Sequence, residues 1–532
     1  MLRERIYLQT DKHLYLAGEL IRIKLTTFDT KQIPLVFSKI AYVELVRDSV
    51  AQIQIKVAMT DGIGEGRMTL PPDLATGFYR LIAYTQYMRN EGMEVFFEKN
   101  VGIINTFQSG YYPATGTEPV QAVSPDKQSA QNTVSIQPDK PVYKIRERGE
   151  LVVTGLPETV YSLSVSLAGR DIITPNSFPP TRLQNTATFS GEYLPEYEGH
   201  IIKGTFIDNQ TGKTGFDNTF LIPVLSFPGK GMRLFTGQKN ETGEVLFFTT
   251  GNFGTKQIAT TVYNADDKYR IDIKSPFVSH FPSKNMPPLT IDSMDYHQLL
   301  MRSVALQASH YFSPDTDEAE TVSEPTLIMK PANSYALDEY TRFTTMREVF
   351  IEFIANARFR RNDGKRELSV VVRKGIDFYF GSNPLVLLDG TPVANHELIY
   401  NYDPLSVEYI NVYNTLCIFG GYTFEGVVEL KTYRGQVSDL DFGKATQIIP
   451  YEGPQLPDKI SNPDYSVQEN RNSRLPDGRH TLLWNPDIRP AGQSTIRIPF
   501  DTSDLTGEFQ ATIEGITKEG TTFQVTTYIK IE

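Results

Sequence analysis

The side chain best suited to acid–base chemistry or metal binding at neutral pH is histidine, and the chain has seven. They are His13, His200, His280, His297, His310, His396 and His480. No two stand four residues apart and no H-E-x-x-H motif occurs, so the spacing that places two imidazoles around zinc on one helix face is missing. We therefore expect isolated histidines and no metal site.

Nucleophilic catalysis has no better support. The chain lacks the G-x-S-x-G elbow and the Walker loop, and its one cysteine, Cys417, lies in an apolar run from Ile410 to Phe419 that should bury it. The 63 acidic residues allow many carboxylate pairs, but the single tryptophan, Trp484, offers little for stacking sugars. The sequence therefore predicts no catalytic residue, no cofactor and no enzyme activity.

The charge balance argues against nucleic acid as a partner. Lys and Arg number 52 against 63 Asp and Glu, a net charge of −11, which repels phosphate unless a basic patch offsets it. The only dense basic cluster is Arg358, Arg360, Arg361, Lys365 and Arg366. Because the turn signal Asn362-Asp363-Gly364 interrupts it, we expect a solvated hairpin there.

The sequence shows no apolar run typical of a membrane-spanning helix, and its first residues do not follow the pattern of a signal peptide. No apolar run reaches the roughly 18 residues that a membrane-spanning helix needs. Met1-Leu2-Arg3-Glu4-Arg5 differs from a signal peptide because strand-like alternation follows at once. We expect either a cytosolic protein or a mature fragment, with a signal peptide not present in this chain.

One stretch of sequence occurs twice. Thr10 to Glu19 reads TDKHLYLAGE, and Pro138 to Glu150 reads PDKPVYKIRERGE. Two copies predict a repeated β module, of a kind that more often binds or spaces than catalyses. We expect the Asp and Lys to end a strand, the Tyr to pack under the turn, and the Gly to let the chain re-enter the sheet. These structural residues are Asp11, Lys12, Tyr15, Gly18, Asp139, Lys140 and Tyr143.

The elements that must position these residues are mostly strands. Period-2 alternation recurs, and 28 Tyr with 31 Phe favour pleated surfaces, so we expect tandem Ig-like antiparallel β-sandwiches. Residues 480–532 are too few for a core of their own and should complete a third sandwich. The predicted divisions are a first sandwich at 1–107, a linker at 108–131, a second sandwich at 132–223, a third from 224–282 and 437–532, a helix and acidic linker at 283–333, and a small α+β domain at 334–436.

Two helices are expected near that α+β domain. The apolar spacing from Ser293 to Tyr311 suits a helix better than a strand. Thr345 with Glu348 forms a capping box, and the following apolar stripe predicts a second helix packed on a core.

The first repeat carries a family resemblance. Tyr7 to Lys24 resembles the signature strand pair of macroglobulin domains in the α2-macroglobulin and complement superfamily, and Gly77-Phe78-Tyr79-Arg80-Leu81 resembles the strand that closes such a domain. The resemblance implies macroglobulin-like sandwiches. Protease-trapping members of that family carry a thioester on a cysteine in a C-G-E-Q setting. Because Cys417 is followed by Ile418-Phe419-Gly420, no thioester and no covalent trapping are expected.

The α+β domain resembles the plug domain of TonB-dependent outer-membrane receptors. The resemblance rests on four segments in order: Pro384 to Val393, Asp403 to Val412, Gly420-Gly421, and Gly426 to Thr432. It implies that Asp389, Gly390, Gly420 and Gly421 form turns. In such receptors a large barrel follows the plug, and too few residues remain here for one.

This combination is similar to large cell-envelope proteins of Bacteroidetes. The resemblance implies residence in the periplasm or at the outer membrane or cell surface, with peripheral or lipid-anchored membrane association of the full-length protein. We expect a non-enzymatic binding or scaffold protein, associated with an outer-membrane transport or export system through its plug-like domain. Its partner would be an outer-membrane barrel protein or an exported polypeptide, contacted by edge-strand addition. The alternatives are a non-covalent protease inhibitor of macroglobulin type, and a glycan-binding component of an uptake system.

Overall fold

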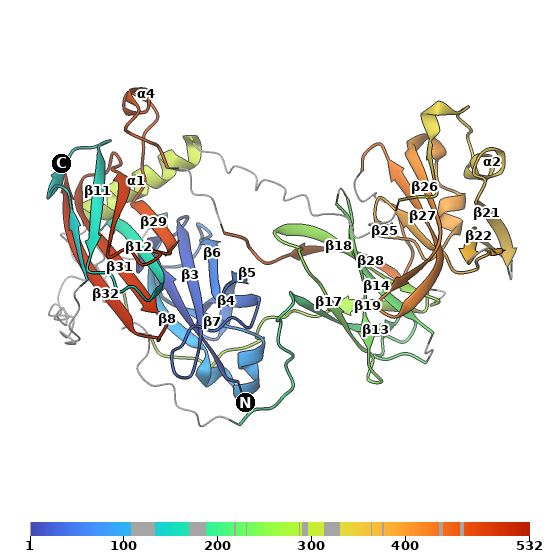
Figure 1. Ribbon diagram of the computed structural model, residues 1–532, viewed down its shortest axis with the longest axis horizontal. Coiled ribbons are helices and arrows are strands. Elements are labelled where there is room, and N and C mark those ends of the chain that lie inside the picture. Colours follow the sequence, from blue (N-terminus) through green and yellow to red (C-terminus); the bar gives the residue numbers. More distant parts are fainter. Residues whose placement is uncertain are drawn as a thin grey trace. The chain divides into compact units, whose positions relative to one another are not determined.

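The computed structural model describes residues 2–107, 134–169, 188–217, 220–229, 231–265, 267–286, 288–289, 296–312, 330–362, 364–374, 377–435, 440–457 and 462–532. The chain is mainly β, which confirms the expected fold class (Figure 1). It divides into unit 1 (Met1–Tyr197, Phe277–Glu318, Pro454–Glu532) and unit 2 (Glu198–Pro276, Ala319–Gly453). The linker predicted at 108–131 and the acidic stretch at 313–320 lie outside the described residues.

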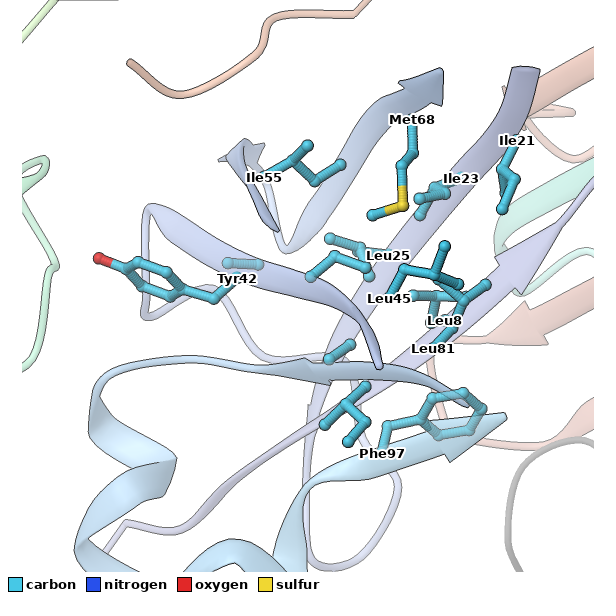
Figure 2. Packing of buried hydrophobic residues seen from close by; sticks show 14 of the residues in the cluster. Leu8, Ile21, Ile23, Leu25, Tyr42, Leu45, Ile55, Met68, Leu81 and Phe97 are labelled. Carbon is cyan, nitrogen blue, oxygen red and sulfur yellow. The ribbon is translucent and has the colours of Figure 1, made fainter. Parts of the chain in front are cut away.

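The first module of unit 1 is a sheet folded into two layers. Its strands are β1 (Glu4–Thr10), β2 (Leu14–Leu16), β3 (Leu20–Asp29), β4 (Ile40–Arg47), β5 (Val50–Thr60), β6 (Ile63–Thr69), β7 (Gly77–Tyr84) and β8 (Phe97–Ile104), with 3₁₀ turns Tyr87–Glu91 and Met93–Val95. The order is β1-β3-β6-β5-β4-β7-β8-β2, and β5 pairs with β6 at only two positions, where the sheet folds over. Figure 2 shows Leu8 and Leu25 of one layer meeting Leu45 and Leu81 of the other.

The second module repeats this strand order from two separate parts of the sequence. Its strands are β9 (Ser135–Pro138), β10 (Val142–Tyr143), β11 (Arg148–Thr154), β12 (Val160–Gly169), β29 (Thr481–Ile488), β30 (Thr495–Asp501), β31 (Gly507–Thr517) and β32 (Thr522–Ile531). One layer runs β9-β11-β30 and the other β29-β12-β31-β32-β10, which matches the first module strand for strand. In both modules the short second strand pairs parallel to the last one.

The two modules also agree in backbone conformation, and comparing their connections shows where unit 2 is inserted. Gly77 and Gly507, which begin the equivalent strands β7 and β31, both have positive φ, 151° and 134°. In the first module β4 and β5 are joined through Asp48 and Ser49 alone. In the second module the equivalent strands β12 and β29 are separated by residues 170–480, which include the whole of unit 2. Unit 2 is therefore inserted into one hairpin of the second module.

This pairing corrects the predicted division. Residues 480–532 do not complete a sandwich with 224–282, because β31 pairs with β12 from Val160–Thr517 to Gly169–Phe509. Nor do residues 132–223 form the second sandwich, because the strands after residue 200 belong to unit 2. Alternation along β31 and β32 shows which faces are buried, but it does not identify the partner strands, and here β12, the partner of β31, and β10, the partner of β32, each lie more than 300 residues away in the sequence.

Unit 2 contains a third sandwich. One sheet runs β16-β17-β13-β19 and the other β15-β14-β18-β28. The strands are β13 (Ile201–Asp208), β14 (Ile222–Phe227), β15 (Arg233–Thr236), β16 (Gln238–Lys239), β17 (Glu244–Phe248), β18 (Thr255–Tyr263), β19 (Tyr269–Ile273) and β28 (Thr446–Glu452). Of the described strands in the predicted 437–532 segment, only β28 joins it.

The α+β domain completes unit 2. Its main sheet runs β20-β26-β27-β24-β25, and a meander β21-β22-β23 packs beside it. Its elements are β20 (Asn333–Ala336), a 3₁₀ turn Leu337–Glu339, α2 (Met346–Glu352), β21 (Ala357–Asn362), β22 (Lys365–Lys374), β23 (Asp377–Phe380), β24 (Leu385–Leu388), β25 (Thr391–Pro392), α3 (Glu397–Tyr400), a 3₁₀ turn Pro404–Ser406, β26 (Val407–Phe419) and β27 (Tyr422–Thr432). Side chains of β24, β26 and β27 share a core with β14, β15 and β18 of the sandwich.

Both predicted helices are present. Thr345 caps α2, accepting a hydrogen bond from the Glu348 N–H at 3.3 Å, and Val349 and Phe350 are buried. In unit 1, α1 (Tyr296–Phe312) packs Leu299 against the first module, and a short helix α4 (Gln468–Arg471) precedes β29. Among the described helices, none has the length and apolar character to cross a bilayer.

Candidate functional site

The first repeat motif closes the turn between β1 and β3. The Tyr15 hydroxyl lies 2.8 Å from Asp11 Oδ1 and 2.8 Å from the Lys12 carbonyl oxygen, and the Arg22 N–H donates to the same Asp11 oxygen at 3.1 Å. Asp11, Lys12 and Tyr15 are buried. Gly18 follows with a φ of 91°, a conformation that a residue with a Cβ adopts at a cost.

The second copy builds the same arrangement. The Tyr143 hydroxyl donates to Asp139 Oδ1 at 2.6 Å and accepts from the Lys140 N–H at 3.1 Å, while the Glu150 N–H donates to Asp139 at 2.7 Å. Burial, then the hydrogen bond to Asp139, raises the pKa of Tyr143. In both copies the carboxylate is occupied by the chain's own donors, so the motif holds a turn.

A buried ion cluster adjoins the first motif. Arg302 of α1 pairs with Glu19, donates to the Leu14 carbonyl oxygen at 2.8 Å, and Lys12 Nζ lies 3.3 Å from Glu19. Burial alone would raise the pKa of Glu19, but the charges of Arg302 and Lys12 outweigh it and hold that pKa well below its usual range. Because every member is engaged and buried, the cluster fixes α1 on the first module.

The turn residues predicted in the α+β domain lie at two hairpin tips. Asp389 and Gly390 have φ of 48° and 83° between β24 and β25, and Gly420 and Gly421 have 52° and 88° between β26 and β27. The Asp389 carboxylate also accepts from the Thr432 N–H at 2.7 Å and hydroxyl at 2.6 Å. These four residues shape turns of unit 2, whereas both repeat motifs belong to unit 1.

A polar hollow of about 840 Å³ lies in unit 2. It is lined by Asn209, Gln210, Asp217, Leu221, Asn264, Ala265, Asp267, Lys268, Tyr269, Asp441, Gly443 and Lys444. Asp217 is bonded to Lys268 and Tyr269, and Asp267 accepts from the Ala445 N–H at 3.0 Å. Across the residues that the structure describes, no cluster of three or more His, Cys, Asp or Glu side chains could hold a metal ion.

The predicted basic hairpin is present as β21 and β22. Two of its arginines are not simply solvated, because they contact an aromatic ring. Leu368, Val370 and Val372 of β22 are buried, so alternate residues of the meander lie on its other face. There Arg358 and Arg360 of β21 place their Cζ atoms 3.6 and 4.0 Å from the ring centroid of Phe380. We call Arg358, Arg360, Glu367, Ser369, Val371, Arg373, Phe378 and Phe380 the arginine–phenylalanine face; in the register Glu367 stands opposite Arg360 and Ser369 opposite Arg358.

Arg358 and Arg360 on this face differ from Arg366, which lies on the same hairpin. Arg366 pairs with Glu397 at 3.2 Å and also stacks on Tyr400. Within the described part of the chain, Arg358 and Arg360 have no carboxylate partner and no hydrogen bond, only the Phe380 ring. Phe378 and Phe380 are 61% and 37% exposed. The face therefore presents two oriented cations beside exposed aromatic rings.

Sequence analysis missed the aromatic half of this face. The alternation of Phe378 and Phe380 could have indicated it, but the pairing of β23 with β22 was needed to place the rings beside the arginines. Cys417, in contrast, is buried as expected, and burial raises the pKa of its thiol.

No family model matches the chain, and no curated protein matches it. Among solved structures it is similar to Salmonella α2-macroglobulin reacted with methylamine (8% identity, 99% of this chain and 39% of that one, TM-score 0.26). It is also similar to the native conformation of Escherichia coli α2-macroglobulin (9%, 99% and 40%, TM-score 0.24) and to the E. coli adhesin FdeC (10%, 51% and 65%, TM-score 0.16).

The chain spans about two fifths of the length of the macroglobulins it resembles. At these TM-scores the likeness carries no argument about function, and the strand pairing described above stands on its own. The structure shows a mainly β chain of tandem sandwiches with an inserted unit.

Proposed function

We propose that the chain is a non-enzymatic binding and scaffold protein of the cell envelope, whose inserted unit 2 contacts a protein partner. The observation that carries the proposal is the insertion itself. The second module closes by pairing β11 with β30 and β12 with β31, strands that lie on either side of unit 2 in the sequence. The modules therefore complete their own sheets, and unit 2 is an addition to one hairpin.

The absence of a recognisable reaction centre in the sequence is consistent with this role. Each described motif residue is occupied in a turn, and the buried charges of the Glu19 cluster are mutually compensated. Exposed arginine and phenylalanine side chains occur instead on the arginine–phenylalanine face, where Arg358 and Arg360 stack on the Phe380 ring. A partner surface needs accessible anchors of this kind, with arginine and aromatic residues the most effective.

The resemblance of the α+β domain to a TonB receptor plug supports a more specific proposal. The partner would be an outer-membrane barrel protein or an exported polypeptide, and the full-length protein would reside in the periplasm or at the outer membrane, with peripheral or lipid-anchored attachment. The sandwich modules would then act as spacers between that attachment and unit 2.

Photo-crosslinking with the intact chain tests the proposal. A benzophenone amino acid is placed at Phe378 in unit 2 or, as the control, at Val50 in the first module, where the side chain is 58% exposed. In envelope fractions of the source organism, we expect one discrete protein adduct from position 378 and none from position 50. Adducts from neither position, or purified partner binding weaker than micromolar, would contradict the proposal.

A further inference from the structure

The strand that carries the two exposed phenylalanines has a free outer edge. In the order β21-β22-β23, β23 is the last strand of the meander. The Gly381 N–H donates to the Val370 carbonyl oxygen at 2.8 Å, so Tyr379, two residues earlier, also bonds toward β22. The backbone N–H and C=O groups of Phe378 and Phe380 alternate with these and point away from β22. Among the described residues, no hydrogen bond engages those outward groups.

The two outward-facing positions also present their side chains to solvent. Phe378 and Phe380 are both exposed, and as alternate residues they stand on one face of the meander. Proteins usually protect a strand edge with charged side chains, with proline or with a covering segment. Here these positions carry aromatic rings, which form stabilising cross-strand pairs with aromatic or β-branched residues. An edge of this kind favours pairing with another strand.

One arginine lies within reach of a strand added at this edge. The guanidinium groups of Arg358 and Arg360 lie on the Phe380 ring, and therefore toward β23. Arg360 faces Glu367 in the register. Arg358 faces Ser369, and within the described part of the chain no carboxylate pairs with it. A side chain added opposite Phe380 would begin about 5 Å from it, so that a glutamate there could reach Arg358.

We propose that the outer edge of β23 binds an extended polypeptide segment as an added strand, with an apolar residue opposite Phe378 and an acidic residue opposite Phe380, beside Arg358. This inference rests on the proposed function and specifies the chemistry of its partner. A polypeptide is favoured over a glycan or a lipid because only a polypeptide can bond the outward N–H and C=O groups in register. A second copy of this chain is disfavoured because edge-to-edge pairing would bring like-charged arginines together on one face.

Two fluorescent peptides of identical composition test the inference on the intact chain. In Thr-Phe-Thr-Glu-Thr-Phe-Thr, Glu and both Phe lie on one face of a strand in either chain direction. In Thr-Phe-Glu-Thr-Thr-Phe-Thr, the Glu lies on the opposite face. Anisotropy titrations are made at about 150 mM salt, where non-specific attraction between exposed charges is screened. We expect the first peptide to bind about tenfold more tightly, the effect of one charge-assisted hydrogen bond.

Variants of the protein separate the contribution of the arginine from that of the edge. Arg358→Gln should weaken the first peptide about tenfold and abolish its advantage over the second. Arg347→Gln, at an exposed site on α2, should leave both affinities unchanged. Phe378→Pro and Phe378→Ala both remove a ring, but only proline removes an outward N–H, so F378P should bind about fivefold more weakly than F378A. Melting temperatures of all variants verify folding.

Several results would overturn the inference. They are equal affinity for the two peptides, a loss of binding in R347Q as large as in R358Q, and identical binding by F378P and F378A. A dimer of the protein that F378P disrupts would also overturn it, since a second copy would then occupy the edge. If neither peptide binds but the crosslink from position 378 persists, the proposed function stands and only this inference falls.

Discussion

Tyr15 and Tyr143 hold equivalent aspartates in settings of different burial. Both tyrosines are buried, but Asp11 is buried as well, whereas Asp139 is exposed. A hydroxyl that satisfies a carboxylate and a backbone N–H is costly to remove when water cannot replace it. Removing the tyrosine hydroxyl should therefore destabilise the second module less than the first. Unfolding of the second module can be followed by the fluorescence of the single tryptophan, because Trp484 lies on β29 of that module.

Tyr143→Phe should lower the free energy of unfolding of the second module by about 1 kcal/mol, because Asp139 and the Lys140 N–H lose a partner. Urea unfolding followed by Trp484 fluorescence measures the change. Tyr197→Phe, at a side chain that is 57% exposed, should not shift the midpoint. A midpoint that is the same in Y143F as in the parent chain would refute the role assigned to the motif.

We expect His396 to make the α+β domain sensitive to acid. Burial lowers its pKa to about 4, and its Nδ1 accepts from the Leu368 N–H at 3.0 Å. Its pKa when unfolded is about 6.5, so the unfolded chain binds the proton first as the pH falls. The stability that neutral His396 provides is thus complete above about pH 6.5 and is lost toward pH 4, by up to about 3 kcal/mol.

His396→Asn keeps an acceptor near Nδ1 and does not titrate. Hydrogen exchange of the β22 amides in both proteins, between about pH 7 and pH 4, gives the difference in opening free energy. We expect the parent chain to lose up to about 3 kcal/mol more than H396N over this range. A difference that does not change with pH would contradict the burial of His396 as a neutral side chain.

The β26–β27 hairpin shows how an element can be constrained beyond its own turn. The sequence indicated a turn at Gly420-Gly421, and both residues have positive φ. The structure adds a close approach, since a Cβ on Gly420 would lie 1.9 Å from Thr236 Oγ1 of β15, whereas a Cβ on Gly421 would meet nothing within 4 Å. The two glycines are thus a matched pair for separating backbone strain from packing.

Gly421→Ala should destabilise unit 2 by about 1 kcal/mol, the cost of positive φ in a residue with a Cβ. Gly420→Ala adds the contact with Thr236 and should cost clearly more. Thermal unfolding of the two variants makes the comparison. Equal losses would show that the hairpin tip does not pack against β15.

At the scale of the whole molecule, the sequence predicts local features better than pairing. The capping box at Thr345, the helix near residue 300, the buried Cys417 and the basic hairpin all follow from neighbouring residues. The division into sandwiches does not follow from neighbouring residues, because the alternation of β32 would fit any sheet that has an unpaired strand. The repeat could have predicted this pairing. In the first module the motif strand β2 pairs parallel with the last strand, so the second motif requires a last strand parallel to β10, and β32 is that strand.

The arginine–phenylalanine face could not be predicted from the sequence for the same reason. Its arginines were visible as a charged cluster, but their proximity to Phe380 depends on β23 folding back onto β22. A site made by cross-strand neighbours is recognisable from sequence only once the register is known.

Cross-linking β11 to β30 tests most directly that the second module closes across unit 2. Val152 and Arg497 are paired in the register, so cysteines at these positions are cross-strand neighbours, and the buried Cys417 should not interfere. A matched control places the partner cysteine at Gln257 of β18, an exposed residue of the third sandwich. We predict that mild oxidation joins V152C to R497C in the folded chain, seen by mass spectrometry, and leaves Q257C with R497C reduced. A disulfide in the control pair and none between 152 and 497 would contradict the account.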